Sequence, residues 1–145
     1  MPNWEQRLRR LLTLHEGRRR YPYLDTVGKV TIGVGRNLDD LGLSDDEIDL
    51  LLTNDLARAT DDLDRALPWW RRLDPVRRAV LADMCFNLGL PRLLGFRAML
   101  RHLGAGEYDD AADHMVESRW YRQVKTRAVR LVRMMRTGAW PSELT

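Results

Sequence analysis

The sequence predicts an α+β protein whose small antiparallel sheet is confined to the first third of the chain. Apolar residues alternate with small or polar ones over residues 30–35 (VTIGVG), and this period of two is typical of a half-buried strand. A turn around Gly28 precedes this stretch, so we expect residues 18–37 to form a sheet built on a hairpin. Elsewhere the apolar residues recur at the three- and four-residue spacing of amphipathic helices.

The helices begin and end at recognisable signals. The first is expected over residues 3–16, with Asn3 as its N-cap. Residues 44–47 (SDDE) form a capping-box pattern that opens a helix of about 22 residues, roughly 33 Å long, which ends before Pro68. Further helices are expected between the Asp74 N-cap and Gly89, and over residues 93–103, 108–117 and 126–137.

These elements predict a single domain, residues 1–145, made of two lobes. The sheet lobe should cover about residues 17–42 and the helical lobe about residues 68–145, with the helix over residues 44–67 connecting them. We expect the helix over residues 3–16 to pack on the helical lobe. A cleft between the lobes is then the expected place for a site.

The charge of the chain is small in total but uneven. The formal net charge is +3, yet residues 39–64 contain ten acidic residues and only Arg58 as a base. Apolar residues at helical spacing run through this acidic segment, which predicts the solvated face of a helix rather than a disordered tail. The basic remainder favours an anionic partner such as nucleic acid, a membrane surface or a bacterial cell wall.

Metal, disulfide and membrane functions are not indicated. Cys85 is the single cysteine, so no internal disulfide can form, and its apolar neighbours predict a buried thiol. His15, His102 and His114 are too scattered in the sequence to suggest a ligand set, so we expect no metal. No apolar run approaches the roughly 18 residues of a membrane span, and the first residues lack the apolar core of a signal peptide.

Residues 15–35 combine the groups that split a glycosidic bond with water. Glu16 precedes Gly17 at the expected helix end, where backbone carbonyls tend to keep a carboxylic acid protonated. If the hairpin is centred on Gly28, Asp25 lies opposite Thr31 and the two side chains share a face. One acid biased to hold its proton, together with a carboxylate beside a hydroxyl, indicates glycoside hydrolysis.

The segments HEG, YLDTVGKVTIGVG, SRWY and TRAVR, with TGAW near the end, resemble the phage-type (T4-like) lysozymes and endolysins of glycoside hydrolase family 24. The resemblance implies a lysozyme-like fold and a muramidase that hydrolyses the β-1,4 bond between N-acetylmuramic acid and N-acetylglucosamine in peptidoglycan, with inversion and without a cofactor. It implies that Glu16 is the general acid and that Asp25 and Thr31 hold the attacking water. The expected consequence is lysis of a bacterial cell.

The resemblance also suggests residues around the site. Phe86 would pack on a sugar ring and Asn87 would hydrogen-bond beside it. Arg127 and Arg130 of TRAVR fall where family members pair an arginine with the catalytic glutamate, although Arg130 would also suit a solvated helix face. Such a pair would lower the pKa of Glu16, against the effect of the helix end, so the sequence leaves the direction of the pKa shift open. Three more positions match substrate contacts although their residue types differ from the T4-like pattern: Asn37, Met99 and His114. The loop RNLDDLG is shorter than in T4-type members, which predicts a smaller sheet lobe.

Three other functions stay open at this point. The basic composition, with a pI of about 9.4, would also suit a helical nucleic-acid-binding protein, but no reading motif accompanies it. A lytic transglycosylase or an inactive wall-binding module would use the same fold. Our expectation is a monomeric enzyme that binds peptidoglycan, binds no nucleic acid and does not insert stably into a membrane. Without a signal peptide it would stay in the host cytoplasm until it is released to the cell wall.

Overall fold

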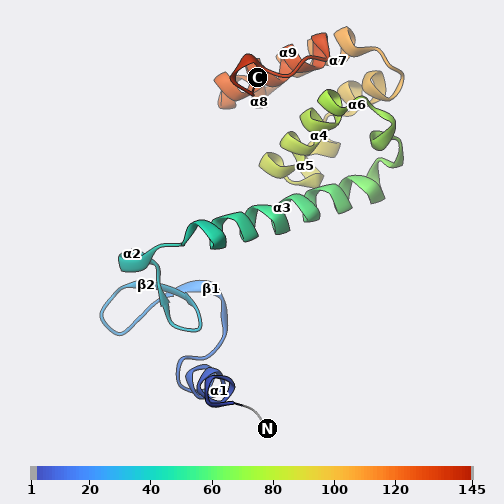
Figure 1. The fold of residues 1–145 in the computed structure, drawn as a ribbon. Coiled ribbons are helices and arrows are strands. Elements are labelled where there is room, and N and C mark those ends of the chain that lie inside the picture. The colour runs from blue at the N-terminus through green and yellow to red at the C-terminus, as the bar shows by residue number, and fades with distance from the viewer. Residues whose placement is uncertain (1–2, 145) are drawn as a thin grey trace. The chain divides into compact units, whose positions relative to one another are not determined.

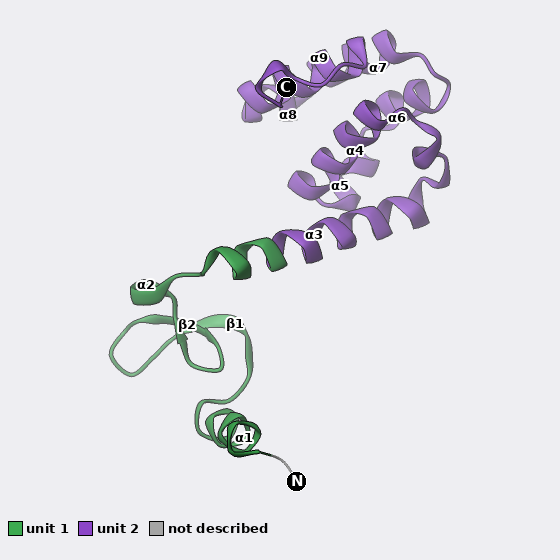
Figure 2. Ribbon diagram, viewed as in Figure 1, with its two compact units in different colours: residues 1–50 green, residues 51–145 purple. Residues whose placement is uncertain are grey.

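The computed structural model describes residues 3–144, which form two compact units. The boundary between unit 1 and unit 2 falls between Leu50 and Leu51, inside a long helix (Figure 2). Unit 1 contains a small sheet and unit 2 is helical, so the predicted α+β class is confirmed. None of the helices in the described part of the chain is long and apolar enough to cross a membrane.

Unit 1 contains a three-stranded antiparallel sheet in the order β1-β2-β3. Strands β1 and β2 are labelled in Figure 1. Its elements are α1 (Trp4–Glu16), β1 (Arg19–Leu24), β2 (Val30–Gly33), β3 (Arg36–Asn37), α2 (Leu38–Leu41) and the beginning of α3 (Asp45–Ala66). In the central strand β2, Thr31 pairs with Tyr23 on one side and with Asn37 on the other. Among the described residues of unit 1, Thr31 alone is buried, with 4% of its surface exposed.

The predicted helix signals of unit 1 are confirmed. The Asn3 side chain accepts the Gln6 N–H at 2.9 Å, as an N-cap should. Ser44 and Glu47 form a reciprocal capping box: the Glu47 N–H donates to Ser44 Oγ at 3.2 Å, and the Ser44 N–H donates to Glu47 Oε1 at 2.8 Å. Helix α3 then runs for 22 residues, as expected.

Unit 2 is a helical unit with one continuous apolar core. After the rest of α3 it contains the 3-10 turn η1 (Pro68–Arg72), α4 (Pro75–Leu88), α5 (Leu90–Leu94), α6 (Arg97–Gly104), α7 (Tyr108–Val116), α8 (Arg119–Val124), α9 (Thr126–Thr137) and the 3-10 turn η2 (Ser142–Leu144). Helix α4 supplies Val80, Leu81 and Met84, all fully buried, and it packs on α9, which also contacts α7. The Asp74 N-cap and the Gly89 C-cap of α4 are confirmed.

Three predictions about the elements need correction. The segment RNLDDLG, expected as a loop, contains β3 and α2, because the Asn37 side chain accepts the Asp40 N–H at 3.0 Å and starts a short helix. The helix expected over residues 93–103 is divided into α5 and α6 at Gly95. Helix α8 was not expected; Ser118 caps it, and Lys125, with a φ of +47°, ends it before α9.

The lobe boundaries expected from the sequence stay predictions. Helix α1 belongs to the same unit as the sheet. Its packing on the helical lobe and the cleft between the lobes stay predictions.

Candidate active site

Glu16 is the last residue of α1, and its carboxyl lies beside the turn that follows β2. Gly17, with a φ of +78°, ends the helix and donates its N–H to the Thr13 carbonyl at 2.9 Å. A methyl group on Gly35 would lie only 2.9 Å from Cδ of Glu16, and Gly35 has a φ of +69°. Glycine has no Cβ, so it avoids the close contact with Glu16 and adopts this positive φ without strain. Among the described residues of unit 1, none forms a hydrogen bond or ion pair with the Glu16 carboxyl.

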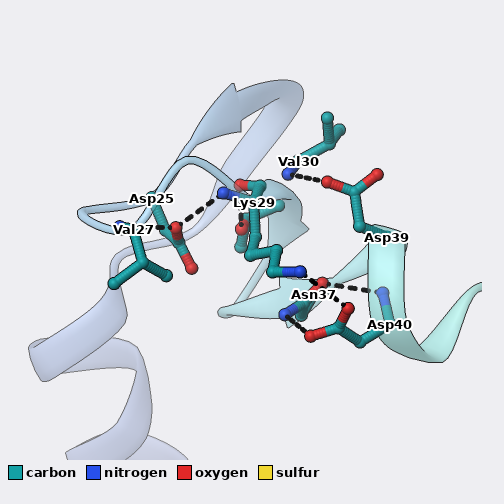
Figure 3. A network of polar contacts seen from close by, with 8 residues as sticks. Asp25, Val27, Lys29, Val30, Asn37, Asp39 and Asp40 are labelled. Atoms are coloured by element: carbon teal, nitrogen blue, oxygen red, sulfur yellow. Dashed lines mark hydrogen bonds and ion pairs between the residues drawn. The ribbon is translucent and has the colours of Figure 1, made fainter.

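Asp25 opens the turn between β1 and β2 and is fixed by that turn. Its Oδ1 accepts the backbone N–H of Val27 at 2.9 Å and that of Lys29 at 2.8 Å (Figure 3). Its own N–H donates to the Lys29 carbonyl at 2.9 Å. Side-chain bonds of this kind let aspartate stabilise a tight turn. Within unit 1 as described, Oδ2 has no hydrogen-bond partner, so one oxygen fixes the turn and the other can bind water.

Thr31 is linked to Asp25 through one backbone carbonyl. The Thr31 hydroxyl donates to the Lys29 carbonyl at 2.9 Å, and the same carbonyl accepts the Asp25 N–H. Because the hydroxyl proton is used in this bond, Oγ1 can offer its lone pairs to another donor, such as a water molecule.

The expected register of the hairpin is wrong by two residues. Tyr23 pairs with Thr31, so Asp25 lies opposite Lys29 and not opposite Thr31. The reason is the position of Gly28: with a φ of +84° it donates to the Asp25 carbonyl at 3.1 Å and occupies the end of the turn rather than its centre. A shift of two residues preserves the face, because side chains alternate with a period of two. Asp25 and Thr31 are thus expected on one face as diagonal neighbours.

Arg36 and Glu47 fix β3 to the start of α3. Arg36 Nη1 donates to Glu47 Oε1 at 2.7 Å and to the Gly42 carbonyl at 3.1 Å. The pKa of Glu47 is lowered to about 2, first by the hydrogen bond from Arg36 and then by those from the backbone and hydroxyl of Ser44. Arg36 therefore has a structural partner in unit 1.

The expected substrate-binding residues are divided among several places. Met99 and His114 line a pocket of about 470 Å³ in unit 2, together with apolar residues that include Phe96 and Trp120. Asn87 accepts a hydrogen bond from Trp120 Nε1 at 3.3 Å.

Phe86 lies at a different pocket of about 350 Å³, beside Cys85. Met99 is only 1% exposed and packs mainly in the core. Asn37 belongs to unit 1, where its side chain caps α2 and donates to Asp40 Oδ2 at 2.9 Å. Their contacts with substrate stay predictions.

Arg127 is paired with an acid of its own unit. Its Nε donates to Asp83 Oδ1 at 2.8 Å, which connects α9 to α4. The pairing with Glu16 suggested by the resemblance stays a prediction, because Glu16 belongs to the other unit.

Two of the three histidines lie together in unit 2, and the expectation of no metal stays a prediction. The rings of His102 and His114 stack with their centroids 5.1 Å apart. His102, Glu107 and Asp110 place ligand atoms within 4.8 Å of one another and are the group in residues 3–144 that could hold a metal ion. Glu107 Oε1 already lies 3.1 Å from His102 Nδ1, and both carboxylates are exposed. Cys85 is buried as predicted, and burial raises the pKa of its thiol, which disfavours the reactive thiolate.

Two residues near the site were missed by sequence reasoning. The strand pattern over residues 30–35 does not single out Gly35, although a glycine two residues after Gly33 signals a second tight turn. Asp39 accepts the Val30 N–H at 2.7 Å, but in the sequence it is one of several acidic residues. Its position just after an asparagine N-cap was the available signal.

A small antiparallel sheet with an acid at a helix end, together with a helical unit, is the arrangement of a lysozyme-like α+β protein. The chain matches the phage lysozyme family over residues 13–136 and belongs to that family. Membership supports glycosidase activity of the lysozyme type, directed at peptidoglycan.

Three individual relatives are each 24–27% identical to this chain. The chain is 26% identical to probable T4-type lysozyme 1 of Dictyostelium discoideum, over 88% of this chain and 92% of that protein. It is 24% identical to probable T4-type lysozyme 2 of the same organism, over 90% and 94% of the two chains. It is also 27% identical to the pre-baseplate central spike protein Gp5 of Enterobacteria phage T4, over 88% of this chain but only 27% of that longer protein.

Proposed function

We propose that this protein is an endolysin-like muramidase that hydrolyses the β-1,4 bond between N-acetylmuramic acid and N-acetylglucosamine in bacterial peptidoglycan. The observation that carries the proposal is the Asp25–Thr31 arrangement. Asp25 Oδ1 accepts the Lys29 N–H, the Thr31 hydroxyl donates to the Lys29 carbonyl, and Asp25 Oδ2 has no hydrogen-bond partner within unit 1 as described. Family membership supports the same reaction class.

Glu16 is the general acid in this proposal. It protonates the leaving glycosidic oxygen as the bond to the anomeric carbon breaks.

Asp25 and Thr31 position the nucleophile. A water molecule that donates one hydrogen bond to Asp25 Oδ2 and the other to Thr31 Oγ1 keeps a lone pair for attack on the anomeric carbon. As this water attacks from the face opposite the leaving group, Asp25 takes its proton, and the configuration inverts. No cofactor is needed for these steps.

The deciding experiment compares the parent with Glu16→Gln on peptidoglycan and on permeabilised bacteria. The substitution preserves the shape of the side chain and removes its proton, so turbidity loss should slow by about 10²–10⁴-fold. Activity within threefold of the parent would contradict the assignment of Glu16.

Analysis of the product tests the rest of the reaction. Proton NMR of freshly released product should show inverted configuration and a free reducing end. Retention would contradict the role of Asp25 and Thr31, and an anhydro-muramic end would identify a transglycosylase instead. Lysis of whole cells, the monomeric state and the location in host cytoplasm before release stay predictions.

A further inference from the structure

The N–H group of Val30 finds no acceptor in β3, the strand that pairs with β2 on the side opposite β1. Strand β3 pairs with β2 only at Thr31 and Ile32 and ends at Asn37, where the chain turns into α2. The next β2 residue toward the hairpin, Val30, is therefore beyond the reach of β3. A backbone N–H at such a position requires an acceptor from elsewhere.

Asp39, in α2, supplies this acceptor. Its Oδ2 accepts the Val30 N–H at 2.7 Å, a short hydrogen bond from a neutral donor to a carboxylate (Figure 3). Helix α2 begins one residue earlier because Asn37 caps it, so the cap places Asp39 against β2.

The peptide group that Asp39 contacts is the one that links Asp25 to Thr31. The Val30 N–H and the Lys29 carbonyl belong to the same planar unit. At its oxygen this unit accepts the Asp25 N–H at 2.9 Å and the Thr31 hydroxyl at 2.9 Å. At its nitrogen it is bound by Asp39. A rotation of this plane would move both acceptor bonds at once.

We propose that Asp39 is a positioning residue for Asp25 and Thr31, which it orients by fixing the Lys29–Val30 peptide plane. The carboxylate also polarises the peptide group, which strengthens its carbonyl as an acceptor. This role rests on the proposed function of Asp25 and Thr31 as the residues that bind the attacking water.

Asp40 provides a matched comparison on the same helix. It carries the same charge, but its carboxylate contacts two side chains, Lys29 Nζ at 3.1 Å and Asn37 Nδ2 at 2.9 Å, rather than the backbone of β2. This ion pair is exposed on both sides, at 42% and 55%, so solvent and salt weaken it. A purely electrostatic effect of α2 on Asp25 would involve both acids, whereas positioning through the peptide plane involves Asp39 alone.

The test measures kcat and KM on soluble glycan strands for the parent, Asp39→Ala, Asp39→Asn and Asp40→Asn, below the midpoint of thermal unfolding of each variant. Asp39→Ala should lower kcat about tenfold or more with KM within about twofold, because small displacements of catalytic groups are costly. Asp39→Asn removes the charge but retains an amide oxygen that can accept the Val30 N–H, so it should restore kcat to within about threefold of the parent. Asp40→Asn should also stay within about threefold.

Three results would overturn the proposal. An unchanged kcat in folded Asp39→Ala would show that the contact serves stability only. Equal losses in Asp39→Asn and Asp40→Asn would assign the effect to charge. Asp25→Asn, measured alongside, separates this failure from that of the proposed function: if it retains full activity, the water-binding assignment fails, and the positioning role fails with it.

Discussion

Unit 1 and unit 2 are stabilised by different interactions. In unit 2 the buried side chains are apolar and form one core, with Leu63, Val80 and Leu81 among its fully buried members. In the described part of unit 1 the one buried residue is polar, Thr31, and the elements are connected by hydrogen bonds, capped helix ends and glycine turns. The hydrophobic effect has no preferred direction, whereas a hydrogen bond weakens steeply when its angle falls below about 120°.

This difference explains where the chemistry lies. The candidate acid and the candidate water-binding pair are all in unit 1, where backbone bonds determine the direction of each side chain. Substitutions in unit 1 should therefore change activity more than stability, and core substitutions in unit 2 should do the reverse.

The largest effect is expected in the core of unit 2. Leu81→Ala should lower the free energy of unfolding by about 2–5 kcal/mol, because Leu81 is fully buried and leaves a cavity. The lytic rate per folded molecule should stay close to that of the parent at low temperature. Urea denaturation and a turbidity assay would measure the two quantities.

The control is Leu94→Ala, at a 37% exposed position of the same unit, which should cost far less. Comparable stability losses for both variants would contradict the description of unit 2 as a packed core.

Thr31→Val tests the opposite expectation in unit 1. The substitution preserves the buried shape and removes the hydroxyl, so lytic activity should fall by about 10²-fold if the hydroxyl binds the attacking water. Stability should change by only about 1 kcal/mol, since the Lys29 carbonyl retains the Asp25 N–H as a donor. Thr31→Ser, which keeps the hydroxyl, should retain most of the activity. Equal losses for Val and Ser would show that packing and not the hydroxyl matters.

Gly35→Ala should act through Glu16. The added methyl would lie 2.9 Å from Glu16 Cδ, and a φ of +69° disfavours any side chain, so the turn or the carboxyl must move. We expect a loss of activity of about tenfold or more. Gly33→Ala is the comparison, because its φ of +68° is similar but a methyl there meets no atom within 4 Å. If both variants lose activity equally, backbone strain rather than contact with Glu16 is responsible.

The fold was predictable where a local signal decides the structure. The caps at Asn3, Ser44 and Asp74 each need only a side chain and an N–H a few residues away, and all three were predicted correctly. The alternation that begins at Val30 predicted the central strand for the same reason, although β2 ends at Gly33 and not at Gly35. The face shared by Asp25 and Thr31 follows from the register even though the predicted pairing was wrong, because an even shift keeps the alternation.

What could not be predicted depends on contacts between elements. The role of Asp39 requires knowing that β3 stops one residue short of Val30, which no periodicity reveals. His102 stacks on His114 because α6 packs against α7. The two residues are 12 positions apart, and their spacing in the sequence does not reveal this contact. Similarly, the contact of Arg127 with Asp83 on α4 joins residues 44 positions apart and is not signalled by the sequence pattern.

The smallest expected effect is a pH dependence at the start of α3, within unit 1. The pKa of Glu47 in the folded protein is about 2, below its ordinary value of 4.5, because Arg36 and Ser44 donate hydrogen bonds to the carboxylate. The ionised form therefore stabilises the fold above about pH 4.5, and this contribution is lost as the pH falls toward 2. The pair is partly exposed, at 35% and 37%, so the effect should be modest. Urea unfolding should show that the parent loses more stability between pH 5 and pH 3 than Glu47→Gln does. Asp46→Asn is the control and should follow the parent. Identical pH profiles for the parent and Glu47→Gln would show that the Arg36 contact contributes nothing in solution.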